Sequence, residues 1–226
     1  MQLTYYGQSC FQVVINGKKV LFDPFIKGNP LAKDIELADI EADYILISHG
    51  HGDHIADAVE LAQQTGATCV SNFEIYQWLT KQGVDKVHPM NHGGQWTFDF
   101  ARVKMVNAIH SSSFPDGSYA GHPAGFILFS ETGNFYFAGD TALMSDMKTW
   151  GERFNLDFAV LPIGDNFTMG AEDAALAANW LQVDRVVGVH YDTFGYIEID
   201  KTVTRQAFEE RQVELLLPRV GEVINI

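Results

Sequence analysis

The chain has 226 residues, of which 46% are hydrophobic and 19% are charged, and its formal net charge at pH 7 is −14. This apolar content is sufficient for a hydrophobic core and excludes a disordered chain. The acidic balance repels polyanions, so extended binding to nucleic acid or to an acidic membrane is not expected. The length fits one large domain, which we expect to span residues 1–226.

The two cysteines, Cys10 and Cys69, do not form a CxxC pair, which favours a reducing compartment and no disulfide. The first residues contain neither a basic nor an apolar stretch of the kind that a leader peptide needs. No apolar run approaches the roughly 18 residues that a membrane span requires. We therefore expect a soluble cytoplasmic protein, and the sequence is compatible with a homo-oligomer.

The chain begins with β-structure. Strands are predicted over 11–15 and 18–22, joined by Asn16-Gly17, a dipeptide typical of a type I′ hairpin turn. Strands and helices then alternate, and Asn72 is expected to cap the second helix. In chain order, this part consists of a strand over 44–48, a helix over 55–64, a strand over 68–70 and a helix over 73–81.

The second half repeats this order. Strands are predicted over 95–100, 101–109, 125–130, 134–138 and 158–162, followed by a helix over 171–181, a strand over 185–189, a helix over 202–211 and strands over 213–217 and 222–226. A β-rich stretch followed by an α/β stretch thus occurs twice. This order predicts two similar halves, each a mixed sheet with helices on one outer face, which together form a four-layer αββα sandwich.

The stretch 48–54 reads Ser-His-Gly-His-Gly-Asp-His and directly follows an apolar predicted strand. Neutral imidazole and carboxylate are ligands that suit zinc and its first-row neighbours. Because residues i and i+2 of an extended segment face the same way, His49 and His51 can bind one metal ion. Asp53 and His54 lie further along and can turn toward a second ion. The two glycines between these residues are expected to let the backbone bend tightly.

Other candidate ligands lie where further apolar strands end. His110, Asp140 and His190 each follow such a strand, as His49 does. Mixed α/β sheets place their sites beyond the carboxyl ends of their strands, so these residues can converge on one crevice. Each has a simpler alternative when taken alone. Asp140 could cap a helix over 141–147, and His110 and His190 could be ordinary strand-end residues.

Taken together, the motif His49-x-His51-x-Asp53-His54, followed by His110, Asp140 and His190, resembles the metallo-β-lactamase superfamily over essentially the whole chain. The finer pattern is similar to small predicted metal-dependent hydrolases related to L-ascorbate-6-phosphate lactonase. Three stretches carry that finer resemblance, namely Asp23-Pro24-Phe25, residues 162–170 and residues 190–194.

The resemblance implies the metallo-β-lactamase fold and a site for two divalent metal ions. His49, His51 and His110 would bind the first ion, Asp53, His54 and His190 the second, and Asp140 would bridge them. It also implies a metal-dependent hydrolase, phosphodiesterase-like or lactonase-like, that uses a bridging hydroxide, with Asp53 accepting a proton during turnover. Zinc is the first expectation for the metal, and the same donors accept manganese, iron or nickel.

The charge of such a site indicates the kind of substrate. Two divalent ions, the carboxylates Asp53 and Asp140 and one hydroxide leave a formal charge of +1, which attracts anions despite the acidic chain. We therefore expect a small anionic substrate, a phosphodiester or a phosphorylated lactone. The alternative is a non-catalytic metal-binding or scaffold protein on the same fold.

Of five further polar residues, three have two possible roles each, and two are expected to take no part in the chemistry. His122 is expected either to contact the substrate or to be a plain loop residue. Asp165 and Asn166 follow a strand end and would either orient the ligand imidazoles or cap the helix that begins at 171. His88 and His92 lie in a segment rich in Pro, Asn and Gly and are expected to be solvated residues that bind no metal.

Overall fold

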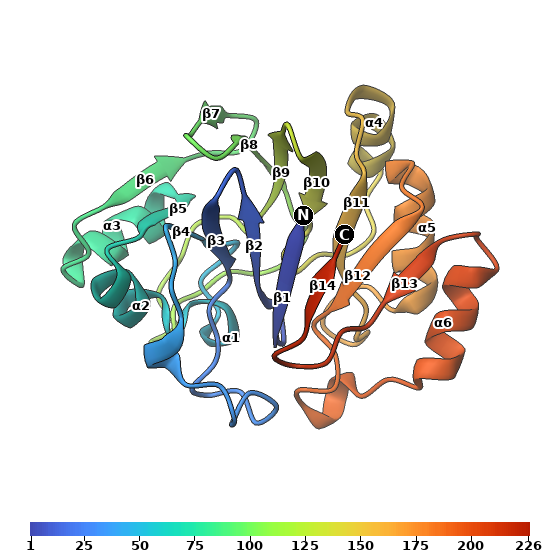
Figure 1. Cartoon of the computed structure of the whole chain (residues 1–226), viewed down its shortest axis with the longest axis horizontal. Coiled ribbons are helices and arrows are strands. Elements are labelled where there is room, and N and C mark those ends of the chain that lie inside the picture. Colours follow the sequence, from blue (N-terminus) through green and yellow to red (C-terminus); the bar gives the residue numbers. More distant parts are fainter.

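Two mixed seven-stranded β-sheets pack face to face in the computed structural model, which describes residues 1–226 (Figure 1). The first sheet has the strand order β14-β1-β2-β3-β4-β5-β6 and the second has the order β13-β12-β11-β10-β9-β8-β7. The first sheet contains β1 (Gln2–Gly7), β2 (Cys10–Ile15), β3 (Lys18–Phe22), β4 (Tyr44–Leu46), β5 (Thr68–Asn72), β6 (Val87–Met90) and β14 (Val223–Asn225). The second contains β7 (Gln95–Thr97), β8 (Arg102–Asn107), β9 (Ala124–Ser130), β10 (Gly133–Phe137), β11 (Phe158–Pro162), β12 (Arg185–Val189) and β13 (Glu214–Leu216).

The helices cover the outer faces of the two sheets (Figure 1). On the first sheet these are α1 (Gly52–Ile55), α2 (Ala58–Thr65) and α3 (Phe73–Lys81), and on the second α4 (Asp146–Arg153), α5 (Ala171–Leu181) and α6 (Lys201–Glu209). Two short 3₁₀ turns, η1 (Leu37–Asp39) and η2 (Gly195–Ile197), lie in loops. The protein therefore has the four-layer αββα architecture that the element order and the resemblance predict.

The two sheets have the same internal plan. Each begins with antiparallel strands and continues with parallel ones, from β3 to β6 in the first sheet and from β10 to β13 in the second. The last strand, β14, breaks the division into halves, because it returns to the first sheet and pairs antiparallel with β1. This pairing places the chain termini side by side, and the amino group of Met1 donates to the carbonyl of Ile226 at 2.7 Å.

Three hydrophobic clusters fill the three spaces between the four layers. The cluster between the sheets includes Phe11, Phe22 and Phe137, all without exposed surface. The rings of Phe11 and Phe22 stack with their centroids 4.4 Å apart, and Phe137 meets both edge-on at 5.1 and 5.3 Å. Such aromatic pairs each add about 0.5–1.5 kcal/mol beyond the burial of their area. The other two clusters lie between each sheet and its helices.

Several local predictions are confirmed by the structure. Asn16 and Gly17 have φ values of 49° and 76°, as a type I′ turn requires. The Asn72 side chain caps α3 by accepting from the amide of Ile75. Cys10 and Cys69 are free thiols buried in strands. The strands 158–162 and 185–189 and the helix 171–181 have the predicted bounds.

Other local predictions need correction. The single helix predicted over 55–64 is two helices, α1 and α2, because the carboxylate of Asp57 turns away to accept the amides of Ile26 and Lys27. The helix α4 and the strand β6 were not predicted. The apolar residues Met147 and Trp150 of α4 do follow a helical spacing and are buried, so this helix could have been found. β6 buries only Met90 and has no such pattern.

Candidate metal centre

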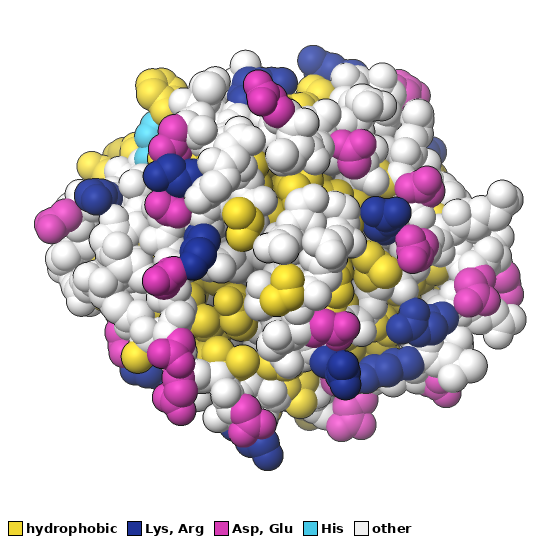
Figure 2. All heavy atoms as spheres, in the orientation of Figure 1, with side chains coloured by type: hydrophobic (Ala, Val, Ile, Leu, Met, Phe, Trp, Pro, Cys, Tyr) yellow, Lys and Arg dark blue, Asp and Glu magenta, His cyan; other side chains and the backbone are white.

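The candidate ligands gather at the carboxyl ends of strands from both sheets. His49 follows β4, His110 follows β8, Asp140 follows β10 and His190 follows β12. Figure 2 shows a different face of the molecule, where acidic and basic side chains are interspersed and histidine appears only at one edge. The strand ends that precede the candidate ligands place the crevice at one end of the sandwich, where loops of the two sheets meet.

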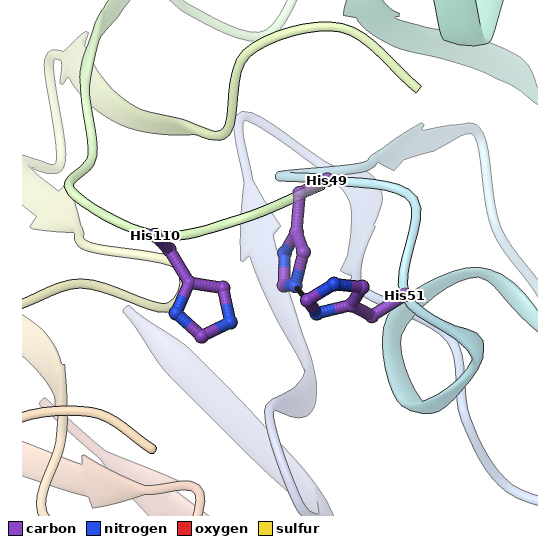
Figure 3. Close-up of side chains that lie close together, drawn as sticks. All are labelled: His49, His51 and His110. Atoms are coloured by element: carbon purple, nitrogen blue, oxygen red, sulfur yellow. Dashed lines mark hydrogen bonds between the residues drawn. The ribbon is translucent and has the colours of Figure 1, made fainter. Parts of the chain in front are cut away.

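One group of possible ligands consists of His49, His51 and His110, whose ligand atoms all lie within 4.8 Å of one another. Figure 3 shows the three rings converging from two loops. Nε2 of His49 lies 3.0 Å from Nδ1 of His51. His49 has no exposed surface, whereas the His110 side chain is 14% exposed. The extended backbone before α1 places His49 and His51 on the same side, as the sequence pattern predicts.

The two glycines of this loop act differently from the prediction. Neither Gly50 nor Gly52 has a positive φ, so neither is needed for a tight bend. Gly50 is required for close packing instead, because a Cβ there would clash with the Cβ of Ala120. Around Gly52 a Cβ would find no atom closer than Pro115, at 4.0 Å. The loop therefore depends on one small residue for space rather than on two for flexibility.

The second group consists of Asp53, His54 and His190, whose ligand atoms also lie within 4.8 Å of one another. Asp53 and His54 belong to the short helix α1, and the ring centroid of His54 lies 4.1 Å from that of His49 in the first group. Oδ2 of Asp53 lies 3.5 Å from Nε2 of His54 and 3.7 Å from Nε2 of His190. The structure thus brings both predicted groups together in one crevice, where a third group, Asp23, His49 and His54, joins them.

Asp140 lies between the two groups. Its Oδ2 is 3.9 Å from Nε2 of His49 and 3.5 Å from Nε2 of His110 in the first group. The same oxygen is 3.2 Å from Nε2 of His54 and 3.0 Å from Nε2 of His190 in the second. The alternative interpretation of Asp140 as a helix cap is wrong, because the next helix, α4, begins only at residue 146.

Two atoms of this cluster suit a metal ion. Nε2 of His54 and Oδ1 of Asp140 are buried and have no hydrogen-bond partner. Buried polar atoms are almost always paired, so an unpaired imidazole nitrogen and an unpaired carboxylate oxygen in one crevice match the needs of a coordinated cation. The donor set of imidazole and carboxylate therefore fits first-row divalent metals.

The sequence pattern includes Asp23 only within Asp23-Pro24-Phe25 and gives it no role at the site. In the structure it supports two of these residues, His54 directly and His49 through Ser48. It is fully buried, accepts from the amide and hydroxyl of Ser48 at 2.7 and 2.5 Å, and lies 2.7 Å from Nδ1 of His54. A proton on Nδ1 of His54 leaves Nε2 free for a metal ion. Asp23 also lies near His49, but its oxygens are already occupied, so we assign it to support rather than to ligation. Asp23 follows β3 directly, so the strand-end rule could have identified it.

Gln8 is the second residue whose role at the site the sequence did not reveal. Its Nε2 donates to Oδ2 of Asp53 at 2.9 Å, and its carbonyl accepts from the amide of His190 at 2.9 Å. Gln8 is fully buried and has a φ of 53°, which is uncommon for a residue with a side chain. One residue thus fixes a carboxylate and a histidine of the second group, and nothing in the local sequence signals this role.

The charges in the crevice are strongly coupled. Burial disfavours a charged His190, but the carboxylates of Asp140 and Asp53 outweigh burial and raise its pKa to about 9. The pKa of His54 is raised in the same way against its burial. Burial raises the pKa of Asp140, but His190 and His54 hold it well below its usual range. Burial lowers the pKa of His49. Protons on His54 and His190 thus occupy positions where a cation is favoured.

A cavity of about 510 Å³ opens onto this cluster. Its wall includes ligand candidates from both groups, together with three phenylalanines. In full, the lining residues are Phe25, His51, Gly52, Asp53, His110, Ser111, Asp140, Phe167, His190 and Phe194. A cleft of this size suits a small-molecule substrate.

The remaining polar residues of interest lie outside the cluster. His122 is exposed and does not line the cavity, with its ring 6.2 Å from those of Tyr119 and His92. Asp165 and Asn166 are exposed and bonded to each other within their own turn. Neither side chain caps α5, whose N-cap is Gly170, so that alternative is wrong.

His88 and His92 also lie apart from the cluster, but they are partly buried rather than fully solvated. His88 belongs to β6 and lies against Trp96, and His92 contacts the carbonyl of Pro123.

Sequence and structure comparisons agree with this fold, which defines a metallo-β-lactamase type of protein. The model of the β-lactamase superfamily domain matches residues 18–191. The UPF0173 metal-dependent hydrolase of Christiangramia forsetii is 53% identical over the full length of both chains. That of Methylacidiphilum infernorum is 51% identical over 98% of both. The chain therefore belongs to the β-lactamase superfamily and, within it, to the UPF0173 metal-dependent hydrolase family.

A solved structure supports the same conclusion. Igni18, a metallo hydrolase from the archaeon Ignicoccus hospitalis, is 36% identical and superposes with a TM-score of 0.89, covering 99% of this chain and 97% of its own. The family and the fold expected from the motif are thus confirmed. None of the helices combines the length and the apolar character that a membrane span requires.

Proposed function

We propose that the protein is a dinuclear metal-dependent hydrolase. The observation that carries this proposal is the position of Asp140, whose Oδ2 lies 3.0–3.9 Å from Nε2 of four histidines. Two of these belong to the first group and two to the second. A carboxylate shared in this way by two separate donor groups supports one ion on each side of it, as in two-metal hydrolases.

Each residue of the cluster has a role in this proposal. His49, His51 and His110 hold the first ion, Asp53, His54 and His190 hold the second, and Asp140 bridges the two. When bound, two divalent ions supply a hydroxide nucleophile near neutral pH and polarise the bond that is cut. Zinc is our first choice of metal, and manganese, iron and nickel suit the same donors.

Asp53 has a second role in the proposal. Its side chain is 24% exposed and lines the cavity, so it can reach both a metal ion and the substrate. The amide of Gln8 holds Oδ2 in place. Burial opposes ionisation of Asp53, but His54 and His190 keep its pKa far below its usual range. The carboxylate is therefore ionised, as a metal ligand must be. Its proposed role as proton acceptor rests on its position in the cavity wall, because so low a pKa makes it a weak base.

The proposed substrate is a small anionic molecule, a phosphodiester or a phosphorylated lactone. The cavity of about 510 Å³ fits a small molecule, and the metal ions bring positive charge to an otherwise acidic protein. The net charge of −14 argues against extended nucleic acid as a substrate.

The test is to reconstitute metal-free protein with zinc or manganese and to measure bound metal by mass spectrometry. Turnover of bis(p-nitrophenyl) phosphate and of a phosphorylated lactone is measured in parallel. We expect two ions per chain and hydrolysis of at least one substrate. His110→Ala should lose metal, and His92→Ala, outside the cluster, should not.

Two outcomes would contradict the proposal in different ways. Fewer than two ions per chain would rule out the dinuclear site. Two ions without turnover of either substrate would favour a non-catalytic metal-binding protein on this fold.

A further inference from the structure

Three phenylalanines line the cavity, and their placement is unusual within this chain. Of the 16 phenylalanines, 12 belong to the three hydrophobic clusters or pack against them. Of the other four, Phe25, Phe167 and Phe194 line the cavity, and Phe73 lies on α3. We call these three residues the aromatic wall. Phe25 is buried, but the exposed rings of Phe167 and Phe194 do not fill the core, so their position needs another explanation.

The aromatic wall presents apolar surface to a ligand. Phe167 is 50% exposed and Phe194 is 37% exposed, whereas Phe25 is buried behind them. The rings of Phe25 and Phe194 lie 6.4 Å apart, and Phe167 meets Tyr196 at 6.1 Å. Exposed aromatic surface beside a polar cluster is a common way to bind a flat apolar group.

Two residues of the aromatic wall are close in sequence to residues that belong to the second group of candidate ligands or contact it. Phe194 follows His190 by four residues, and Phe25 follows Asp23, which contacts His54, by two. Asp53, Asp140 and His190 line the same cavity as the wall, so a ligand that stacks on the wall would share that cavity with the cluster.

The charge of the cavity restricts the ligand further. No lysine or arginine lines the cavity, so a bound anion has only metal ions to balance it. Asp23 is a third carboxylate beneath the cluster. The formal charge of the site is zero when two divalent ions, three carboxylates and one hydroxide are counted. It is +1 when Asp23 is left out. A substrate with one negative charge fits this balance better than a phosphate group with two.

We infer that the substrate is a phosphodiester of single negative charge that carries an aromatic or similarly flat apolar substituent, which binds against Phe167 and Phe194. This inference rests on the proposed hydrolase function and narrows its substrate class. It disfavours the phosphorylated lactone, whose phosphate is a dianion without a cationic side chain to receive it.

The test compares the binding of matched probes to zinc-loaded protein by calorimetry. Methyl phenyl phosphate and dimethyl phosphate have the same single charge and differ by one phenyl ring. We expect the phenyl probe to bind about tenfold more tightly, which corresponds to about 1.4 kcal/mol. Phenyl phosphate, with two charges, should bind no more tightly than methyl phenyl phosphate.

The variants assign this preference to the wall. Phe167→Ala and Phe194→Ala should each reduce the ratio between the two singly charged probes, and the double variant should bring it near one. Phe73→Ala is the matched control, because Phe73 is 47% exposed and also lies outside the hydrophobic clusters. It should leave the ratio unchanged.

The outcomes separate this inference from the proposed function. The aromatic wall would be ruled out as a binding surface if methyl phenyl phosphate and dimethyl phosphate bound equally well or not detectably. It would also be ruled out if the ratio of their affinities were unchanged in the double variant. Tighter binding of phenyl phosphate would overturn the charge limit. If the ratio depends on the wall but neither bis(p-nitrophenyl) phosphate nor the phosphorylated lactone is hydrolysed, the binding inference holds and only the hydrolase proposal fails.

Discussion

Oδ2 of Asp23 lies 2.7 Å from Nδ1 of His54, and both side chains are fully buried. The two residues are 31 positions apart in the chain. The same oxygen accepts the hydroxyl of Ser48, whose Oγ lies 3.0 Å from Nδ1 of His49. One buried carboxylate therefore orients a histidine of each donor group, directly in one case and through a serine in the other. Residues that hydrogen-bond to the second ring nitrogen of a metal-binding histidine fix its tautomer and its ring orientation.

The substitution Asp23→Asn should weaken metal binding about 10- to 100-fold, because the amide no longer supports a proton on Nδ1 of His54. The side chain keeps its shape, so the fold should persist. The dissociation constant for zinc, measured by competition with a chelator, checks this. Asp85→Asn removes an exposed carboxylate and serves as the control. Equal zinc affinity in the two variants would show that Asp23 is dispensable for the site.

The substitution Asp140→Asn tests the bridging role. It removes the charge of the one oxygen that lies near four histidines, so both donor groups should bind metal more weakly. We expect fewer than two ions per chain by mass spectrometry and a loss of turnover of at least 100-fold, by analogy with ligand or outer-partner loss. If Asp140→Asn retained both its metal content and its activity, the bridging assignment would be wrong.

Gly50 and Gly52 form a matched pair for a test of packing. Gly50→Ala forces a methyl group into the space of Ala120, at a cost of about 1–3 kcal/mol or a displacement of the loop that carries His49 and His51. Gly52→Ala meets only open space and has no positive φ. Urea unfolding and zinc titration of both variants should show a clear loss for Gly50→Ala only. A similar loss in both would mean that backbone freedom matters more than space.

The stability of the metal-free protein should fall as the pH rises from about 6.5 to about 9. The pKa of His190 is raised to about 9 in the folded chain, so the protonated form stabilises the fold below about 6.5. This contribution, on the order of 3 kcal/mol, is lost as the pH rises through the folded pKa. Metal competes with the same proton, so metal affinity should rise over the same range.

Thermal unfolding in the presence of a chelator, at several pH values, checks this pH dependence. The comparison is with His190→Asn, since asparagine accepts the left-handed backbone found at this position, where φ is 57°. The wild-type midpoint should fall more steeply with pH than that of the variant. Parallel curves would indicate that His190 does not carry the raised pKa.

The sequence by itself determined which residues could bind metal and where the main elements lie. Asn16-Gly17 specifies its turn because both residues accept positive φ, and Asn72 specifies a helix start because its side chain caps α3 locally. His49, His110, Asp140 and His190 could be found because each follows the carboxyl end of an apolar strand, where mixed α/β sheets place their sites. These signals are local or follow from a general rule of sheet topology.

Only the tertiary structure decided what surrounds those residues. The contacts of Gln8 with Asp53 and of Asp23 with His54 join positions 45 and 31 residues apart. The return of β14 to the first sheet and the grouping of Phe25, Phe167 and Phe194 around one cavity likewise depend on how distant loops meet. Side-chain contacts of this kind are set by the packing of the two sheets, which brings these loops together, and no local pattern encodes them. The candidate donors of the proposed metal centre are therefore visible in the sequence, whereas the residues that support them and the cavity wall are not.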